Sequence, residues 1–325
     1  MKSVNLILGT MTFGESVFSP NVSAFVNTFL DAGYDELDTA YVYNEGKSER
    51  FLGEVLPDLN RPYKIATKVN PRISGRLDDE AAYKQVNESL KRMNLESVDT
   101  VYLHFPDPNT PVESVLAAMS DLYVQGKYKE LGLSNFPAWM VADVCHICDN
   151  HGWVKPTVYE GIYNPLTRGA EAELTDCLNY FGIRFYAYNP LCGGLLTGRY
   201  DNYSDKPADG RFTHRPNYQG RYWKRSFFDG LKIIKSSAEK YGISSIEATY
   251  RWLAHHSMLD GNRGDAIIVG ASKLNHLQQN IEAMKAGPLP NDVVEAFEDA
   301  WMVTKGDSPK YFTLYKGKGS VGGEK

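Results

Sequence analysis

The sequence has little of what several protein classes require. Four cysteines in 325 residues are too few for a disulfide framework, and no apolar run approaches the length of a membrane span. The formal net charge of −5 leaves no excess of basic residues for nucleic-acid phosphates. The first apolar run is too short for a signal peptide, and no small-residue cleavage site follows it. We therefore expect a cytoplasmic protein with no nucleic-acid partner and no membrane anchor.

Histidine and cysteine form no metal-binding pattern either. The seven histidines are scattered, and the adjacent His255 and His256 face different ways on a helical stretch. Cys145 and Cys148 have the spacing of a redox or metal pair, but apolar residues around them recur at helical spacing and no second pair follows. A buried helix, in which cysteine acts as a small hydrophobic residue, explains them better than chemistry does. No metal is expected.

Short apolar runs recur along the chain and alternate with amphipathic stretches. This alternation is typical of parallel strands joined by helices through right-handed crossovers. Eight such runs predict a closed (β/α)8 TIM barrel, a single α/β domain over residues 1–315, followed by a flexible tail at 316–325. The predicted strands are Val4–Leu8, Glu36–Asp38, Lys64–Val69, Thr100–His104, Leu131–Ser134, Thr157–Tyr159, Arg184–Tyr188 and Ala266–Val269.

A doubly wound sheet is the alternative fold for this order of elements. That fold carries a glycine-rich turn after its first strand, whereas the stretch after Val4–Leu8 has only Gly9 and Gly14. The seventh strand is followed by an unusually long connection, residues 198–225, rich in Gly, Pro, Asp, Asn, Tyr and Arg. A connection this long is usually functional or disordered, and its aromatic and arginine content favours a lid.

Polar residues close several of the predicted strands, at the end where TIM-barrel chemistry lies. Strand two ends at Asp38 with Tyr43 in the loop after it, strand three reaches Lys68, and strand four ends at His104. Each has an ordinary alternative: Asp38 as a helix cap, Lys68 as a solvated cation, His104 as a core histidine. Four chemically matched side chains on consecutive units at one face are harder to explain by packing.

These side chains suit the protonation of a carbonyl oxygen. Tyrosine has an ordinary pKa of about 10, and an ammonium beside the phenol lowers that pKa. We therefore expect Asp38 to hold Lys68, Lys68 to make Tyr43 more acidic, and Tyr43 to donate the proton. His104 would orient the carbonyl towards the phenol or share the proton. The chain has no hydride of its own, so a nicotinamide cofactor is implied.

Several motifs resemble those of the aldo-keto reductase superfamily. They are LDTAYVYNEGKSERFLG, ATKV, HFPDP, LGLSNF, YNPLCGGLLTGRY and IIVGASKLNHLQQNI, in family order and over most of the chain. YEGIYN, NPLCGGLLTG and GRYW resemble the aflatoxin-aldehyde reductase branch, which also reduces succinic semialdehyde. The resemblance implies a barrel that binds NADPH or NADP+ in extended form and reduces aldehydes or ketones to alcohols. It also implies a small carbonyl substrate and, because the branch is typically dimeric, a homodimer.

The resemblance also implies roles for individual residues. The catalytic tetrad of the family falls on Asp38, Tyr43, Lys68 and His104, with Tyr43 as the proton donor. The implied cofactor contacts are Ser134, Asn135, Glu160, Tyr188 and Asn189 around the nicotinamide, Leu191, Gly193, Gly194, Leu195 and Gly198 at the pyrophosphate, and Arg211, Gly270, Ser272, Lys273, Gln278 and Asn280 towards the adenosine end. The implied substrate contacts are His104, Tyr218 and Arg221.

The segment VGASKLNHLQQN bears on the choice between NADPH and NADH. Ser272 is a candidate N-cap for the helix that follows, and a helix N-terminus attracts phosphate. Lys273, with Arg211 from the long connection, would supply cations for a 2′-phosphate, which favours NADPH. The alternative for Lys273 is simple solvation.

Two positions depart from the family pattern. The family usually has glutamine where this chain has Glu160, and an ionised glutamate only accepts hydrogen bonds. We expect its charge to favour oxidised nicotinamide, the alternative being a protonated or cation-paired Glu160 that behaves like glutamine. The branch usually ends in YFR, whose arginine helps to bind a substrate carboxylate, and here Thr313 takes its place. A larger or neutral carbonyl compound is therefore favoured over succinic semialdehyde.

Two further activities stay open on the sequence. The same enzyme can oxidise an alcohol, because cellular cofactor ratios set the direction of such reactions. A cofactor-sensing subunit with little turnover, like the potassium-channel β subunits of this superfamily, also keeps the four residues of the tetrad.

Overall fold

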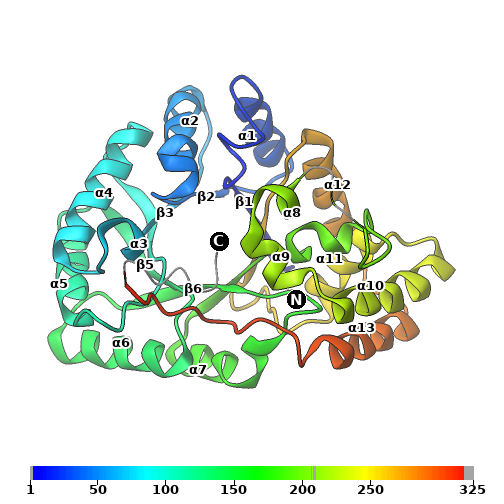
Figure 1. The fold of residues 1–325 in the computed structure, drawn as a ribbon. Coiled ribbons are helices and arrows are strands. Elements are labelled where there is room, and N and C mark those ends of the chain that lie inside the picture. The colour runs from blue at the N-terminus through cyan, green and yellow to red at the C-terminus, as the bar shows by residue number, and fades with distance from the viewer. Residues whose placement is uncertain (1–2, 206, 208–209, 318–325) are drawn as a thin grey trace.

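Eight parallel strands form a closed barrel in the computed structural model, which describes residues 3–205, 207 and 210–317 (Figure 1). Each strand pairs with its neighbours in chain order, and β1 pairs with β8 to close the barrel. The strands are β1 Asn5–Gly9, β2 Glu36–Asp38, β3 Lys64–Val69, β4 Val98–Leu103, β5 Tyr128–Ser134, β6 Pro156–Ile162, β7 Arg184–Tyr188 and β8 Ala266–Val269. The predicted TIM barrel is therefore confirmed, and β2, β3, β7 and β8 have the predicted bounds.

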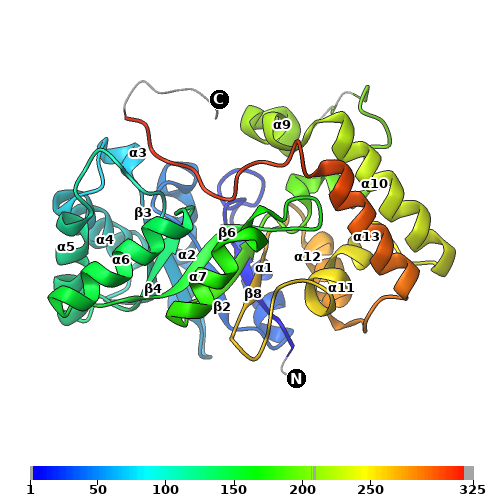
Figure 2. The same ribbon diagram turned by 90° about the horizontal axis from the view of Figure 1, so that it is seen from below.

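Helices surround the barrel because its strands are buried on both faces and need an apolar cover. The α-helices are α1 Asn21–Asp31, α2 Lys47–Val55, α3 Pro71–Ser74, α4 Asp79–Met93, α5 Val112–Val124, α6 Ala138–His151, α7 Leu174–Phe181, α8 Arg211–His214, α9 Pro216–Tyr222, α10 Arg225–Ala238, α11 Ser245–His255, α12 Leu274–Lys285 and α13 Asn291–Thr304. Short 3-10 turns are η1 Tyr43–Gly46, η2 Leu56–Asp58, η3 Gly169–Ala172, η4 Cys192–Thr197 and η5 Glu239–Tyr241. Helices α10 and α13 lie side by side on the flank next to α11 (Figures 1 and 2).

The cysteine pair lies where the apolar spacing places it. Cys145 and Cys148 are both buried on α6, in the apolar layer between this helix and the barrel. The helix ends at Gly152, whose left-handed φ of 67° lets the chain turn back towards β6. The buried-helix interpretation of this motif is therefore confirmed.

The side chains inside the barrel change from apolar to charged along the barrel axis. An apolar cluster fills it, formed by Ile7, Ala66, Tyr102, Val158, Tyr186, Ala266 and Ile268. Above this cluster, towards the carboxyl ends of the strands, the buried side chains of Asp38, Lys68 and Glu160 replace apolar ones. A charged layer this deep is costly unless its members are paired, which marks it as a functional candidate.

Two segments from the second half of the chain lie over the carboxyl ends of the strands. The connection after β7 contains α8 and α9 and is therefore partly helical. The segment after α13 runs across the loops that follow β6, β5 and β4 (Figure 2): the N–H of Thr313 donates to the carbonyl of Asn135 at 3.1 Å, and that of Tyr315 to Pro106 at 2.9 Å. Most of the predicted flexible tail, residues 318–325, lies outside the described residues.

Candidate active site

The strand register brings the charged layer together. Gly9 pairs with Asp38, Asp38 with Ala66, and Lys68 with Tyr102. On the far side of the barrel, Ser134 of β5 pairs with Glu160 of β6. Parallel strands in this register turn the side chains of Asp38, Lys68 and Glu160 into one layer of the barrel interior.

Lys68 lies between two carboxyl groups. Its Nζ donates a short hydrogen bond to Oδ1 of Asp38 and another, of 2.9 Å, to the carbonyl oxygen of Thr39. Oε2 of Glu160 lies 3.0 Å from the same nitrogen. Burial alone would lower the pKa of Lys68, but Asp38 and Glu160 outweigh it and raise the pKa. The lysine therefore stays charged, as the sequence predicted for its pairing with Asp38.

Tyr43 stands beside this group on the short turn η1. Nζ of Lys68 lies 5.4 Å from the centre of its ring, and the ring of His104 meets it edge-on at 6.0 Å. The turn is unusual because Asn44 and Glu45 both have left-handed φ values, 50° and 58°. Asn44 stabilises this conformation, because its Nδ2 donates to two carbonyls of the β1–α1 loop, at 2.8 and 2.7 Å.

The pKa of Tyr43 differs from the expectation. Burial, followed by the charges of Asp38 and Glu160, raises it well above its ordinary value. The sequence predicted a lowered pKa from Lys68 alone, and that prediction is wrong, because burial, followed by the acidic groups of Asp38 and Glu160, raises the pKa instead. Tyr43 is consequently fully protonated at neutral pH and available as a proton donor.

His104 is a neutral imidazole with a fixed tautomer. Burial, then Lys68 and Arg72, lower its pKa well below the ordinary value. Oδ1 of Asn70 accepts from the backbone N–H of Arg72 at 2.9 Å, so its amide nitrogen faces Nδ1 of His104 at 3.1 Å. Nδ1 must accept this bond, which leaves the proton on Nε2. His104 can therefore donate a hydrogen bond from Nε2.

Amide and hydroxyl groups cluster at the ends of β5 and β7. Nδ2 of Asn135 donates to Ser134 Oγ and to the carbonyl of His104, both at 3.0 Å. The hydroxyl of Tyr188 donates to Oδ1 of Asn135 at 2.7 Å. These bonds hold Asn135 in a left-handed conformation, with φ of 62°. Ser134, Asn135 and Tyr188 thus form one connected group beside His104 and Glu160.

The turn after β7 is built around two glycines. Gly193 and Gly194 have φ of 68° and 108° within η4. A Cβ on Gly193 would stand 2.6 Å from the ring of Tyr218, so a side chain there is excluded, whereas a Cβ on Gly194 would meet nothing within 4 Å. Open space beside a left-handed glycine backbone fits a phosphate approached by N–H groups. Leu191 and Gly198 flank the turn, and Leu195 is buried in it.

The segment after β8 corrects one expectation. Ser272 does not cap α12, because Lys273 is the residue before its first turn and no side chain caps the helix. The chain stays extended through Lys273, which delays the helix by one residue. Burial, then the charges of Lys273 and Arg199, lower the pKa of His276, so both cations act on this histidine near the helix N-terminus. Asn280 is buried in α12, and Gly270 and Gln278 are exposed.

The predicted lid residues pack among aromatic rings. Tyr218 is buried, and its hydroxyl donates to Oδ1 of Asn189 at 3.3 Å. The guanidinium groups of Arg211 and Arg221 lie 4.9 and 5.5 Å from the ring centre of Tyr218. Tyr218 is close enough to Tyr43 to help raise the pKa of Tyr43.

Two residues of this region were missed in the sequence. Asn70 follows β3 by one residue and orients His104, and it would have been found by asking for the polar residue after each strand as well as within it. Arg215, between α8 and α9, pairs with Glu15 at 2.7 Å and donates to Oδ1 of Asn44 at 3.1 Å. No local pattern indicates such a contact, because its partners are far away in the sequence.

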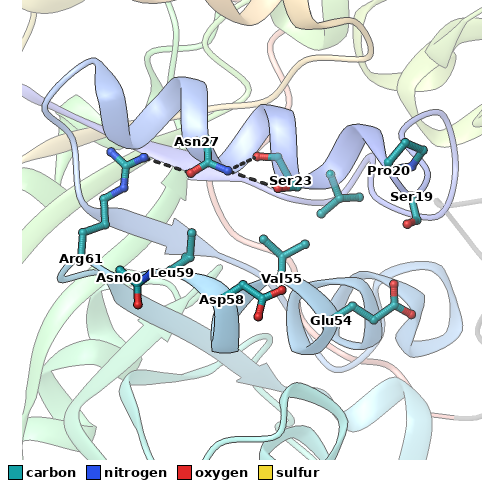
Figure 3. Close-up of a pocket in the computed structure, with 11 residues that line it drawn as sticks. Ser19, Pro20, Ser23, Asn27, Glu54, Val55, Asp58, Leu59, Asn60 and Arg61 are labelled. Atoms are coloured by element: carbon teal, nitrogen blue, oxygen red, sulfur yellow. Dashed lines mark hydrogen bonds between the residues drawn. The ribbon is translucent and has the colours of Figure 1, made fainter.

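A separate cleft lies between α1 and the α2–η2 segment (Figure 3). Its volume is about 510 Å³, and Asn27 and Arg61 form hydrogen bonds along its wall. Glu54 and Asp58, which also line it, are exposed. A cleft without a buried titratable group is a weaker candidate than the charged layer, although pockets of this size often bind ligands.

No helix in the described part of the chain is long and apolar enough to cross a membrane. No group of three or more His, Cys, Asp and Glu side chains among these residues is placed to hold a metal ion.

Comparison with known proteins agrees with the site. The model of the aldo/keto reductase family matches residues 5–302. The human "Aldo-keto reductase family 7 member A3" is 44% identical, covering 94% of this chain and 96% of that protein. The mouse "Aflatoxin B1 aldehyde reductase member 2" is also 44% identical, over 94% and 87%. A fungal aldo-keto reductase of Pseudocercospora fijiensis is 39% identical, over 88% and 99%. The chain therefore belongs to the aldo/keto reductase family, and it is an oxidoreductase of carbonyl compounds that uses a nicotinamide cofactor.

Proposed function

We propose that the protein reduces aldehydes or ketones to alcohols with NADPH, and that Tyr43 donates the proton. The observation that supports this most directly is the grouping of Tyr43, Lys68 and His104 at one end of the barrel, within reach of one small molecule. Bound NADPH supplies the hydride to the carbonyl carbon. The names of the relatives, which include aflatoxin B1 aldehyde reductases, support an aldehyde as the substrate.

Tyr43 and His104 have complementary tasks in this proposal. His104 donates from Nε2 to the carbonyl oxygen and so fixes the position of the substrate. As charge develops on that oxygen, the phenol of Tyr43 transfers its proton to it. A raised pKa does not prevent this transfer, because an alkoxide is a much stronger base than a phenolate. Lys68 stabilises the resulting phenolate through its charge.

The residues at the ends of β5, β6 and β7 fit a nicotinamide. Ser134 and Asn135 offer groups that pair with a carboxamide, and the ring of Tyr188 offers a surface for stacking. We assign Glu160 to the same subsite and Asn189 to its edge. The residues of the turn after β7, Leu191, Gly193, Gly194, Leu195 and Gly198, would hold the pyrophosphate through backbone N–H groups.

NADPH is preferred in this proposal because cations gather near α12. Lys273 lies at the N-terminus of α12. The charges of Lys273 and Arg199 both lower the pKa of His276. Nη1 of Arg199 lies 3.7 Å from the position of a Cβ on Gly210, which precedes Arg211. Lys273 and Arg199 suit the two negative charges of a 2′-phosphate, and Arg211 follows directly on the residue that Arg199 approaches. Ser272, Gly270, Gln278 and Asn280 complete the proposed adenosine subsite.

The proposal is tested by steady-state reduction of 4-nitrobenzaldehyde with NADPH and with NADH. We expect turnover with both cofactors and a kcat/KM for NADPH at least about tenfold higher, the effect of one charge-assisted contact. Equal values would contradict the assignment of the 2′-phosphate site. Tight NADPH binding without turnover on a panel of aldehydes, diketones and quinones would contradict the enzyme and favour a cofactor sensor.

The assembly state and cellular location are further proposals. We infer a homodimer in the cytoplasm, on the strength of the resemblance and of the sequence. Sedimentation of the purified protein tests the first, and a monomer at micromolar concentration would contradict it.

A further inference from the structure

Glu160 shares its cation with a second carboxyl group. Asp38 and Glu160 approach Lys68 from opposite walls of the barrel, and the exposed fractions of the three side chains are 4%, 5% and 0%. One ammonium neutralises one carboxylate. The second carboxylate would be an uncompensated charge in a site that water does not reach, and such groups take up a proton instead.

The surroundings decide which carboxyl keeps the proton. Asp38 accepts the short hydrogen bond from Lys68, whereas Oε2 of Glu160 lies near the ammonium without a well-aligned bond. The titratable groups around Glu160 are Asp38 of β2, Lys68 of β3, Tyr43 of η1, Tyr102 of β4 and Tyr159 of its own strand. The three tyrosines are neutral, because burial raises the pKa of each.

These contacts make the carboxyl of Glu160 a weaker acid than an ordinary glutamic acid. Burial, then the charge of Asp38, raise the pKa of Glu160 to about 8, against the opposing effect of Lys68. The protonated form of Glu160 is therefore favoured at pH 7. Glu160 resembles glutamine in this state, since it is neutral and has both a donor and an acceptor.

We propose that binding of NADP+ expels this proton and that binding of NADPH does not. The inference rests on the proposed function, which puts the nicotinamide at the ends of β5 and β6. The oxidised ring carries a positive charge and the reduced ring is neutral, so only the oxidised ring favours a carboxylate beside it. The proton passes from the carboxyl of Glu160 to the buffer, and no other bond changes.

The linkage predicts how affinity depends on pH. If NADP+ binding releases a proton, its dissociation constant falls as the pH rises towards about 8, by up to tenfold per pH unit, and then levels off. The dissociation constant of NADPH does not share this trend. The 2′-phosphate titrates in both cofactors, so the ratio of the two constants isolates the effect of the ring.

Calorimetric titration at pH 7 tests the inference. Each cofactor is titrated into the wild-type protein in phosphate and in Tris, because the heat difference between the buffers counts released protons. We expect at least about half a proton more for NADP+ than for NADPH, and no difference in Glu160→Gln. Equal release for the two cofactors in the wild type, or an unchanged difference in Glu160→Gln, would overturn the inference.

A matched variant and a second measurement complete the test. Glu36→Gln removes a different buried carboxyl, on β2, which accepts a hydrogen bond from the Tyr186 hydroxyl. The cations that act on Glu36 are Lys64 and Arg184 rather than Lys68, so this variant should keep the difference between the cofactors. If Glu160→Gln fails to fold, the ratio of the two constants in the wild type decides. A ratio that is constant from pH 6.5 to 9 overturns the inference. Absence of binding by either cofactor would instead contradict the proposed function.

Discussion

Nδ2 of Asn70 donates to Nδ1 of His104 across 3.1 Å, and this bond fixes the tautomer of the histidine. Asn70 is itself fixed by Gln85, whose side chain bonds its backbone N–H at 2.9 Å and its carbonyl at 3.1 Å. The position of the proton on His104 is therefore set from β3 and α4.

Asn70→Asp should reverse that tautomer. An aspartate keeps the cap on Arg72 but accepts a hydrogen bond from Nδ1–H, so the proton of the neutral imidazole lies on Nδ1, and Nε2 can no longer donate. We expect kcat/KM to fall on the order of 100-fold, as for other lost donors to a developing oxyanion, with NADPH affinity unchanged. Side-chain ¹⁵N shifts of His104 report the tautomer directly. A variant that keeps the wild-type tautomer or the wild-type rate would contradict this role; Asn87→Asp, on the exposed face of α4, is the control.

The catalytic layer was predictable because its signals are local. A polar residue that closes an apolar run can be read from the sequence, and barrel topology then aligns Asp38, Lys68 and His104 at one end. The pKa of Tyr43 was predicted wrongly because it depends first on burial and then on Asp38 and Glu160, and Glu160 comes from the opposite side of the barrel. The first residue of α12 depends on packing rather than on the capping preference of Ser272. Arg215 contacts Asn44 across 171 residues, and no sequence pattern reports that.

Glu160→Gln should make the protein more stable at high pH. The folded-state pKa of about 8 lies above the ordinary 4.5, so the folded chain binds more protons than the unfolded chain between these values. The free energy of unfolding of the wild type therefore falls as the pH rises through that window, by at most about 1.4 kcal/mol per pH unit from this group. Urea unfolding of the wild type and of Glu160→Gln at pH 5, 7 and 9 measures the free energy of unfolding of each. The advantage of the variant should grow with pH and level off above about 8; an advantage that does not change with pH would contradict the buried proton.

Arg215→Gln should speed the release of NADPH. Arg215 ties the connection after β7 to Glu15 and to the turn that carries Tyr43. Loss of a half-buried ion pair of this kind removes about 1 kcal/mol, so we expect the dissociation rate to rise about fivefold. Stopped-flow fluorescence of the bound cofactor measures the rate. Arg61→Gln removes a surface pair with Asp31 on α1 and should leave the NADPH dissociation rate unchanged. Equal rates in the wild type and both variants would show that Arg215 does not slow NADPH release.

Arg72→Met should impair the reduction of negatively charged aldehydes selectively. The Arg72 guanidinium lies 4.0 Å from the ring centre of Phe105, which stacks on His104 at 4.7 Å. This geometry puts a cation at the mouth of the site, where Thr313 supplies none. We expect kcat/KM for 4-carboxybenzaldehyde to fall about tenfold more than for 4-nitrobenzaldehyde. Arg76→Met is the control, because Arg76 is an exposed residue that pairs with Asp78. An equal loss of kcat/KM on both aldehydes in Arg72→Met would rule out charge recognition by Arg72.

Tyr43 delivers the proton in the proposed reaction. Single-turnover oxidation of bound NADPH by 4-nitrobenzaldehyde in the wild type and in Tyr43→Phe measures this role, together with the NADPH dissociation constant of each protein. We expect a rate at least about 100-fold lower in the variant, with the dissociation constant changed by less than about twofold. A variant that oxidises NADPH at the wild-type rate would contradict it.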